Sequence, residues 1–169
     1  AAHDGRFSAT VVYATPNPYT CANCQTPRPS THEPVILTME FFGKTLSGPF
    51  TIPSGIVTTA TPIIQYIFDH MPEVGVVTTK SIGLEPRAGN REPVYSQYAP
   101  GCFVNAVGLT NPGAQASRDM LAALRVPADR FLLTSIFGGS IEEFVAVAKI
   151  LAPVSDGLEL NLSCPHAKG

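Results

Sequence analysis

The stretch that decides the fold is "RFLLTSIFGGSIEEFVAVAKILAPVSDGLELNLSC", residues 130–164. Short apolar runs at residues 130–138 and 157–164 indicate buried strands, and the segment between them has apolar residues at helical spacing. Ser140 and Glu143 have the spacing of a capping box, which predicts that this helix begins just after Ser140. A strand, a helix and a strand in this order predict two parallel strands joined by a right-handed crossover.

The same alternation extends toward the N-terminus. We expect buried strands at residues 49–55 and 75–81, and helices at residues 61–71 and 117–126. Alternating strands and helices indicate an α/β protein, built either as an open doubly wound sheet or as a (β/α)8 barrel. No G-x-G-x-x-G follows the first of these strands, which disfavours a dinucleotide-binding open sheet. Because a TIM barrel has eight strands, the expected strands make the first half of a (β/α)8 TIM barrel.

The segments outside this alternation have a different character. Residues 1–33 contain many prolines and few periodic apolar residues, which predicts an irregular N-terminal arm. The N-terminal half of the barrel is then expected in residues 34–169. Residues 35–48 alternate apolar and polar side chains around Gly43, which predicts a hairpin that caps the barrel. Residues 82–113 are rich in Gly and Pro and predict a long loop, a kind of segment that is usually functional.

Composition and charge argue against several classes of function. The 169 residues carry a formal net charge of −2, so no basic field attracts nucleic acid or an anionic membrane. No apolar run approaches the roughly 18–20 residues of a membrane span, and the first residues lack the pattern of a signal peptide. The 4 cysteines are expected to be reduced. A cytoplasmic enzyme is the simplest expectation, and the low charged fraction of 14% leaves room for a large interface.

A specific resemblance is carried by the motifs "TKSIGLEPRAGN" at residues 79–90, "NAVGLTNPG" at 105–113 and "ELNLSCPH" at 159–166. Together they resemble the flavin-dependent dihydroorotate dehydrogenases, in particular the soluble class with a cysteine base. The related dihydropyrimidine dehydrogenases share the "NLSCPH" pattern. The resemblance covers residues 34–169 and leaves the arm outside. It implies a barrel that holds FMN and oxidises a dihydropyrimidine ring.

The resemblance implies that Cys164 is the catalytic base. A free thiol has a pKa near 8.5, which nearby cations and dipoles lower toward the working pH. A base of that kind is typically worth about 10²–10⁴ in rate. An inert buried cysteine is the alternative, because free cysteines are common in protein cores. His166 is a second candidate for the base, since its intrinsic pKa lies near 6.5, and it stands where dihydroorotate dehydrogenases often have Asn.

The resemblance also assigns residues to substrate and cofactor. Lys80 matches a lysine beside the flavin ring and the substrate carboxylate, where a cation stabilises developing negative charge. The expected substrate-binding residues are Lys80, Asn105, Val107, Gly108, Leu109 and Asn161. The expected FMN-binding residues are Ser54, Gly55, Lys80, Ser81, Ser135 and Asn161. Gly108 permits a close approach of the backbone to a ligand. Val107 departs from the Met of several relatives, and Ser135 departs from a frequent Asn.

Cys21 and Cys24 form a C-x-x-C pair in the N-terminal arm. Such a pair can supply half of a zinc or iron–sulfur site, or act as a redox pair, so a Zn or Fe–S site is one expectation. A tetrahedral site needs four ligands, and the other candidates, His3, His32 and Cys102, have no recognisable spacing. Cysteines that hold no metal are the alternative.

The resemblance implies FMN-dependent oxidation of dihydroorotate to orotate in pyrimidine biosynthesis. One ring carbon loses a proton to Cys164 while its neighbour passes a hydride to the flavin. The remaining strands of the barrel are expected from a further segment or a second polypeptide, in a homo- or hetero-oligomer. A dihydropyrimidine dehydrogenase acting on dihydrouracil or uracil is the alternative enzyme. A non-catalytic electron-transfer or assembly subunit is the alternative outside catalysis, and fumarate and NAD through a partner subunit both remain as electron acceptors.

Overall fold

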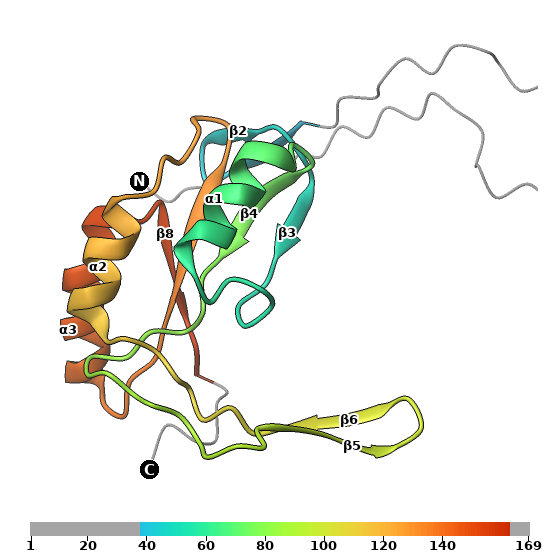
Figure 1. Cartoon of the computed structure of the whole chain (residues 1–169). Helices are drawn as coiled ribbons and strands as arrows, with labels where there is room; N and C mark the ends of the chain where they lie inside the picture. Colours follow the sequence, from blue (N-terminus) through green and yellow to red (C-terminus); the bar gives the residue numbers. More distant parts are fainter. Residues whose placement is uncertain (1–37, 163–169) are drawn as a thin grey trace, which may run out of the picture.

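The structure is a computed structural model that describes residues 38–162. Its centre is a sheet of parallel strands that lie side by side in chain order (Figure 1). The strands are β3 (Phe50–Ile52), β4 (Val74–Thr78), β7 (Phe131–Ile136) and β8 (Gly157–Leu160). Each was expected from its apolar run, and the prediction of a parallel α/β fold is confirmed. The predicted N-terminal arm lies outside the described residues.

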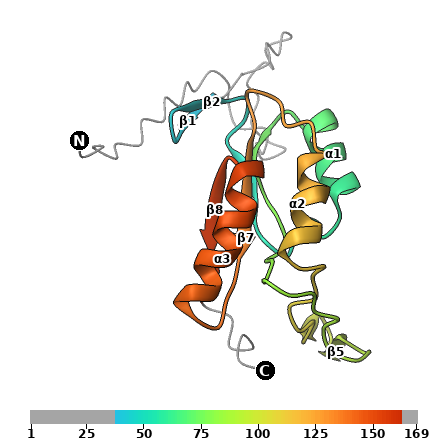
Figure 2. The same ribbon diagram turned by 90° about the vertical axis from the view of Figure 1, so that its left-hand side faces the viewer.

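The helices of the described part pack against one face of this sheet (Figures 1 and 2). They are α1 (Thr61–His70), α2 (Ala114–Ala122) and α3 (Ile141–Leu151), and the short 3-10 helix η1 (Ala152–Val154) follows α3. A single core joins Ile64 of α1, Leu121 of α2 and Val147 of α3 to Leu132 of the sheet. An open doubly wound sheet carries helices on both faces, whereas a barrel carries them only outside. The arrangement therefore favours part of a barrel.

Alternation along β7 distinguishes the two faces of the sheet. Leu132 and Ile136 are buried among the helices, whereas Phe131 packs in a separate cluster with Leu46. Because successive side chains of a strand point to opposite faces, Ser135 lies on the same face as Phe131. This second face is the inside of the partial barrel. Polar side chains on this face, such as Ser135, point inward and can contribute to a ligand-binding site.

The predicted hairpin of residues 35–48 is confirmed and closes the N-terminal end of the sheet. Strands β1 (Met39–Phe41) and β2 (Lys44–Leu46) pair antiparallel. The turn between them is made by Phe42 and Gly43, which both have positive φ. Leu46 is fully buried at 0% exposure, and it packs with Phe131 at the start of β7. The hairpin thus fills the inside of the partial barrel at the end opposite the expected site.

Helix α3 begins where the capping box predicts. Ser140 is the N-cap residue, and its Oγ accepts a hydrogen bond from the Glu143 N–H at 3.2 Å. The Glu143 carboxylate accepts in turn from the Gly139 N–H at 2.7 Å, one residue before the N-cap. Hydrogen bonds from its own backbone N–H and from the Ser140 side chain hold the pKa of the Glu142 carboxyl below its ordinary value. Negative charge in the first turn also suits the helix dipole.

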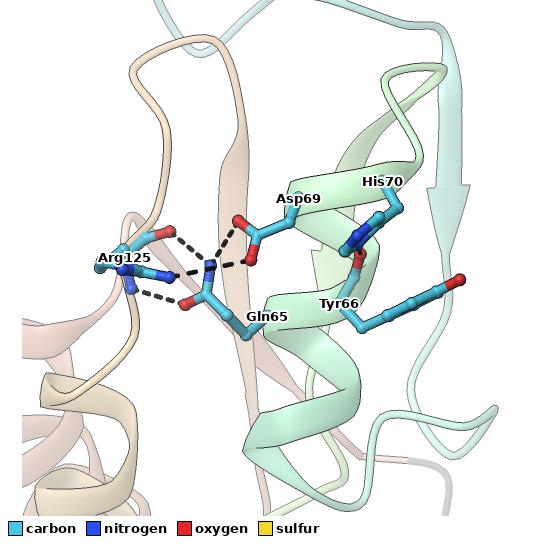
Figure 3. Close-up of polar contacts among 5 residues, drawn as sticks. All are labelled: Gln65, Tyr66, Asp69, His70 and Arg125. Carbon is cyan, nitrogen blue, oxygen red and sulfur yellow. Dashed lines mark hydrogen bonds and ion pairs between the residues drawn. The ribbon is translucent and has the colours of Figure 1, made fainter.

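Polar contacts join α1 to the segment that follows α2 (Figure 3). Gln65 accepts a hydrogen bond from the Arg125 N–H at 2.9 Å and donates from Nε2 to the Arg125 carbonyl at 3.2 Å. The Arg125 guanidinium also lies 3.8 Å from the Asp69 carboxylate. On another side of α1 the rings of Tyr66 and His70 stack with centroids 4.3 Å apart. Helix α1 is therefore fixed to its neighbour on one side and presents an aromatic pair on another.

Residues 82–113 differ from the prediction of a continuous loop. They contain a second antiparallel hairpin, β5 (Tyr95–Ala99) and β6 (Cys102–Asn105), which projects away from the sheet (Figure 1). Tyr95 and Phe103 stack across it with centroids 5.2 Å apart. Gly101 provides the positive φ of the turn. The abundance of Gly and Pro on both sides of this hairpin concealed its short alternating strands in the sequence.

Helix α2 departs from its predicted bounds of residues 117–126. It begins at Ala114, directly after Gly113, whose φ is +84. The Asn111 Oδ1 accepts a hydrogen bond from the Gly113 N–H at 2.9 Å, and this turn sets the start of the helix. Helical spacing of apolar residues gives no signal for such a side-chain contact, so the sequence placed the start too late.

The outer strands of the sheet are each paired on one side only within residues 38–162. Strand β3 pairs with β4, and β8 pairs with β7. Large apolar side chains lie exposed at these edges, Phe50 in β3 at 61% and Leu160 in β8 at 55%. Unpaired strand edges and exposed apolar side chains together mark an interaction surface.

Candidate functional site

A cavity of about 440 Å³ lies at the C-terminal ends of the sheet strands. Its lining comes from segments that are far apart in the sequence: the three residues after β3, the residues after β4, the loop before α2, and the end of β8 with the residue that follows it. The lining residues are Pro53, Ser54, Gly55, Lys80, Ser81, Leu109, Glu159, Leu160 and Asn161. Most of the residues expected to bind cofactor or substrate are therefore gathered around one space, at the end of the strands where barrel enzymes bind their ligands.

A chain of hydroxyl groups links the strand ends beneath this cavity. The Ser54 and Ser81 hydroxyl oxygens lie 3.3 Å apart, and those of Ser81 and Ser135 lie 2.9 Å apart. The Asn161 Nδ2 donates to the Ser81 hydroxyl at 3.0 Å. Ser54, Ser81 and Asn161 follow β3, β4 and β8, and Ser135 lies near the end of β7, so the network connects every strand of the parallel sheet. Ser135 is fully buried behind Ser81, and does not line the cavity itself.

Lys80 lies between the cavity and the end of β4. Its backbone N–H donates to the Thr58 carbonyl at 3.2 Å, which ties it to the loop after β3. Its ammonium would lie 4.0 Å from a Cβ built on Gly55, whose φ is +85. No carboxylate among residues 38–162 lies within ion-pair distance of Lys80, although Glu159 lines the same cavity. A lysine so placed offers its positive charge to a bound ligand.

The loop "NAVGLTN" has a fixed backbone conformation. Gly108 and Leu109 both have positive φ, +79 and +54. The Asn90 N–H donates to the Val107 carbonyl at 3.0 Å, and a Cβ on Gly108 would lie 2.8 Å from atoms of Asn90. The space that requires glycine at position 108 is therefore occupied by Asn90, whereas the sequence argued for a close approach of ligand. Contacts within the protein therefore hold this loop in one conformation.

Asn111 organises the same loop from within. Its side-chain oxygen accepts from the N–H groups of Gly83 at 3.3 Å and Gly113 at 2.9 Å, and its Nδ2 donates to the Leu109 carbonyl at 2.8 Å. The residue is buried, and it holds its own loop, from Leu109 to Gly113, against Gly83. Its buried amide therefore has a structural role that the sequence motif did not reveal.

The remaining expected substrate residues are more dispersed. Asn105 is exposed at the end of β6, where it pairs in register with Tyr95, and neither it nor Val107 lines the cavity. Leu109 does line it. Sequence reasoning missed Glu159, which the alternation of β8 could have found, because Glu159 and Asn161 are two residues apart and so share a face.

Several expected residues lie outside the part of the chain that the structure describes. They are Cys21, Cys24, Cys164 and His166, and their roles stay predictions. Within residues 38–162 no group of three or more His, Cys, Asp or Glu side chains could hold a metal ion. In the same residues, no helix combines the length and the apolar character needed to span a bilayer.

A parallel sheet in chain order, with helices on one face and a cavity at its C-terminal end, defines part of a (β/α)8 barrel. The sequence model of a family described as dihydroorotate dehydrogenase matches residues 36–169. The chain therefore belongs to the dihydroorotate dehydrogenase family, and the resemblance seen in the sequence motifs is confirmed.

Curated relatives agree with this assignment. A protein of Pyrococcus furiosus named dihydroorotate dehydrogenase B (NAD(+)), catalytic subunit, is 41% identical over 131 residues, which are 78% of this chain and 42% of that protein. A protein of the same name from Methanocaldococcus jannaschii is 38% identical over 130 residues, 75% of this chain and 42% of that protein. The chain thus spans less than half the length of these relatives.

A solved structure supports the fold. The crystal structure of DHODH from Eimeria tenella in complex with ferulenol is similar with a TM-score of 0.65 and 21% identity. The similarity covers 85% of this chain and 41% of that one. At this identity the likeness concerns the fold alone, and it supports the prediction of a partial TIM barrel.

Proposed function

We propose that the protein oxidises dihydroorotate to orotate in pyrimidine biosynthesis, with FMN bound in the cavity of about 440 Å³. The observation that carries the proposal is the gathering of Ser54, Lys80, Ser81 and Asn161 around this one space. Membership of the dihydroorotate dehydrogenase family and the names of the curated relatives point to the same reaction.

The residues around the cavity suit a flavin. A flavin ring is flat and apolar on its faces and carries donors and acceptors along its edge. Gly55 presents bare backbone, and among residues 38–162 only the Lys80 ammonium lies within 4.0 Å of the position that a Cβ on Gly55 would take. Ser54, Lys80, Ser81 and Asn161 offer hydroxyl, ammonium and amide groups to the ring edge. FMN held there supplies the hydride acceptor that oxidation of the substrate requires.

In this proposal Ser135 does not contact FMN directly and acts through its contact with Ser81. It is fully buried, and its hydroxyl lies 2.9 Å from that of Ser81. The Ser135 N–H also donates to the Thr79 hydroxyl at 3.1 Å. These contacts support the hydroxyl that faces the cavity, so Ser135 is a positioning residue in place of the expected flavin ligand.

Lys80 provides the positive charge of the proposed site. Dihydroorotate carries a carboxylate, and FMN bound beside Lys80 would gain negative charge on reduction. A fixed cation stabilises both, and such an arrangement is among the largest contributions to enzymatic rates. With no carboxylate of the described residues in ion-pair distance, the charge of Lys80 is available for this purpose.

Cys164 is proposed as the base that removes the proton. It follows Asn161 by three residues, and Asn161 lines the cavity at the end of β8. A thiol close to the Lys80 ammonium gains thiolate character at neutral pH, because a nearby cation favours the charged form. Proton removal by Cys164 and hydride removal on the opposite face of the substrate ring then complete the oxidation.

The proposed enzyme needs more strands than the described residues contain. We propose that further β/α units pair with the edges of β3 and β8, supplied by another segment or chain. The relatives are named as NAD(+)-linked catalytic subunits. We therefore propose that electrons leave the flavin for NAD(+) through a partner subunit, in a hetero-oligomer.

Turnover by the complete protein tests the proposal. The protein purified with all its chains is expected to contain FMN and to oxidise dihydroorotate, and to leave dihydrouracil unchanged because that substrate has no carboxylate for Lys80. Cys164→Ser is expected to lower kcat by about 10²–10⁴ at neutral pH while the FMN absorbance stays. Lys80→Met is expected to weaken dihydroorotate binding.

The opposite substrate preference contradicts the proposal. Oxidation of dihydrouracil without oxidation of dihydroorotate indicates a dihydropyrimidine dehydrogenase instead. Full activity in the Cys164→Ser protein refutes the thiol base, and Cys102→Ser serves as the matched control because Cys102 lies exposed on the projecting hairpin.

A further inference from the structure

Glu159 is a charged residue of the cavity that the proposed reaction does not use. It lies in β8, where it pairs in register with Ser135 of β7. The preceding residue, Leu158, packs against the core between the sheet and the helices. Because successive side chains of a strand point to opposite faces, Glu159 lies on the inside of the partial barrel, as Ser135 does. Glu159 and Lys80 are the charged residues that line the cavity of about 440 Å³.

The surroundings of Glu159 differ on the two sides of β8. On one side β7 covers it, and Ser135 there is fully buried. Further toward the N-terminal end, the inside of the partial barrel is filled by the apolar cluster of Leu46, Val76 and Phe131. On the other side β8 pairs with no strand among residues 38–162, and Glu159 is partly exposed. Solvent at this open edge accommodates the charge of the carboxylate.

A strand that pairs with the open edge of β8 changes this environment. Neighbouring strands lie about 4.7–4.9 Å apart, and parallel pairing sets residues of one face side by side, as Ser135 and Glu159 are. The new strand therefore places an inward-pointing residue directly beside Glu159 and excludes solvent from that side. An ionised carboxylate inside a closed barrel is strongly unfavourable unless it is paired and hydrogen-bonded.

The described residues do not supply the partner. Among residues 38–162 no basic side chain lies within ion-pair distance of Glu159. Lys80 follows β4, which β7 separates from β8, so their backbones lie roughly 10 Å apart at the usual strand spacing. The positive charge of Lys80 across the same cavity also disfavours protonation of Glu159 as the way to remove its charge.

We infer that Glu159 is the internal counter-ion of a lysine or arginine on the strand that pairs with β8 in the complete protein. A basic side chain both neutralises the carboxylate and donates hydrogen bonds to it. The pair fixes the register of that strand, because a slip by one residue turns the cation to the outer face. The inference rests on the proposed completion of the barrel, and it does not depend on which substrate is oxidised.

The strand beside β8 provides the first test. A crystal structure of the complete protein is expected to show a Lys or Arg of that strand on the inner face, with its charged group within ion-pair distance of the Glu159 carboxylate. An inner face with only neutral or acidic residues beside Glu159 overturns the inference.

Urea unfolding of the complete protein provides the second test. Glu159→Gln keeps the shape of the side chain but leaves the internal cation without its counter-ion. It is expected to lower the folded-to-unfolded ratio by about 30-fold, which is about 2 kcal/mol at about 1.4 kcal/mol for each ten-fold step. Glu73→Gln, at an exposed glutamate in the turn before β4, is the matched control and is expected to change the ratio by less than about two-fold. A Glu159→Gln protein as stable as the parent, or more stable, overturns the inference, because an unpaired carboxylate inside the barrel gains from neutralisation.

A double-mutant cycle tests the pairing itself. The basic residue is replaced by Met in the parent and in the Glu159→Gln protein. The replacement is expected to lower the folded-to-unfolded ratio less in the Glu159→Gln protein, by a factor of about ten or more. If Glu159→Gln alone does not fold, recovery of folding in the double variant supports the pair. Additive losses overturn it. If the complete protein does not oxidise dihydroorotate, the proposed function fails, whereas the structure and the unfolding results still judge the ion pair.

Discussion

Gly43 and Gly108 have nearly the same backbone angle but different surroundings. Their φ values are +78 and +79. Within the part of the chain that the structure describes, a Cβ at Gly43 would meet nothing within 4 Å, whereas a Cβ at Gly108 would lie 2.8 Å from the backbone nitrogen and side chain of Asn90. The pair separates the cost of the backbone angle from the cost of crowding, because an L residue is strained equally at both positions.

We expect Gly43→Ala to lower the free energy of unfolding by about 1–2 kcal/mol, the usual cost of the left-handed region. Gly108→Ala is expected to cost a further 1–3 kcal/mol or so, because crowding displaces Asn90 and the loop. Urea unfolding of both variants of the complete protein measures the difference. Equal losses would show that the contact with Asn90 relaxes freely and that the loop is not fixed by it.

At the scale of single residues, the sequence predicted which side chains lie close together, but it did not predict the hydrogen bonds between them. Ser54, Lys80, Ser81 and Asn161 were expected together because the family resemblance assigns all four to FMN or the substrate, and the structure places them at the C-terminal ends of neighbouring parallel strands. The support of Ser81 by Ser135 was not predictable. That support depends on which face of a strand each hydroxyl occupies and on distances of about 3 Å, which a motif does not encode.

At the scale of elements, the N-terminal hairpin is part of the core and not an accessory. Leu46 in β2 is fully buried and packs with Val76 and Phe131 inside the partial barrel. Lys44 donates from Nζ to the Arg130 carbonyl at 2.9 Å and the Asp156 carboxylate at 2.7 Å. The hairpin therefore bridges the N-terminal ends of β4, β7 and β8.

Leu46→Ala is expected to lower the free energy of unfolding by about 2–5 kcal/mol, since the lost side chain leaves a cavity in a closed cluster. Thr45→Ala is the matched control: it alters the preceding residue of the same strand, whose exposed side chain donates a hydrogen bond to the Glu40 carboxylate at the surface, and it is expected to change stability by less than about 0.5 kcal/mol. Urea unfolding of the two variants provides the comparison. A small effect of Leu46→Ala would mean that the hairpin is not integral to the barrel core.

The elements that the sequence predicted well are those with two independent signals. Helix α3 combined helical spacing with a capping box, and hairpin β1–β2 combined alternation with Gly43. The hairpin β5–β6 also had a turn signal, at Pro100 and Gly101, but that signal lies within a segment whose overall Gly and Pro content favoured a loop. The start of α2 depended on the Asn111 side chain, and a contact between side chain and backbone is not visible in apolar periodicity.

At the scale of the whole molecule, the clearest prediction concerns the two edge strands of the sheet. In the complete protein, β3 and β8 should be interior strands of a closed barrel, because an exposed parallel edge lined by Phe50 and Leu160 is unfavourable in water. Their amides are then expected to exchange hydrogen as slowly as those of β4 and β7. Hydrogen–deuterium exchange with peptide resolution measures this. Fast exchange confined to β3 and β8 would contradict closure of the barrel at these strands.

The hydroxyl chain beneath the cavity allows one set of atoms to serve two kinds of ligand group. Because Asn161 donates to Ser81, the single proton of Ser81 goes to either Ser54 or Ser135. If it goes to Ser54, the proton of Ser54 is available to a ligand oxygen. If it goes to Ser135, Ser54 donates inward and its oxygen lone pair faces a ligand N–H. Rotation of O–H bonds alone thus switches the site between offering a proton and receiving one, so a bound ring that changes its protonation during turnover could be matched in both states without displacement of any heavy atom.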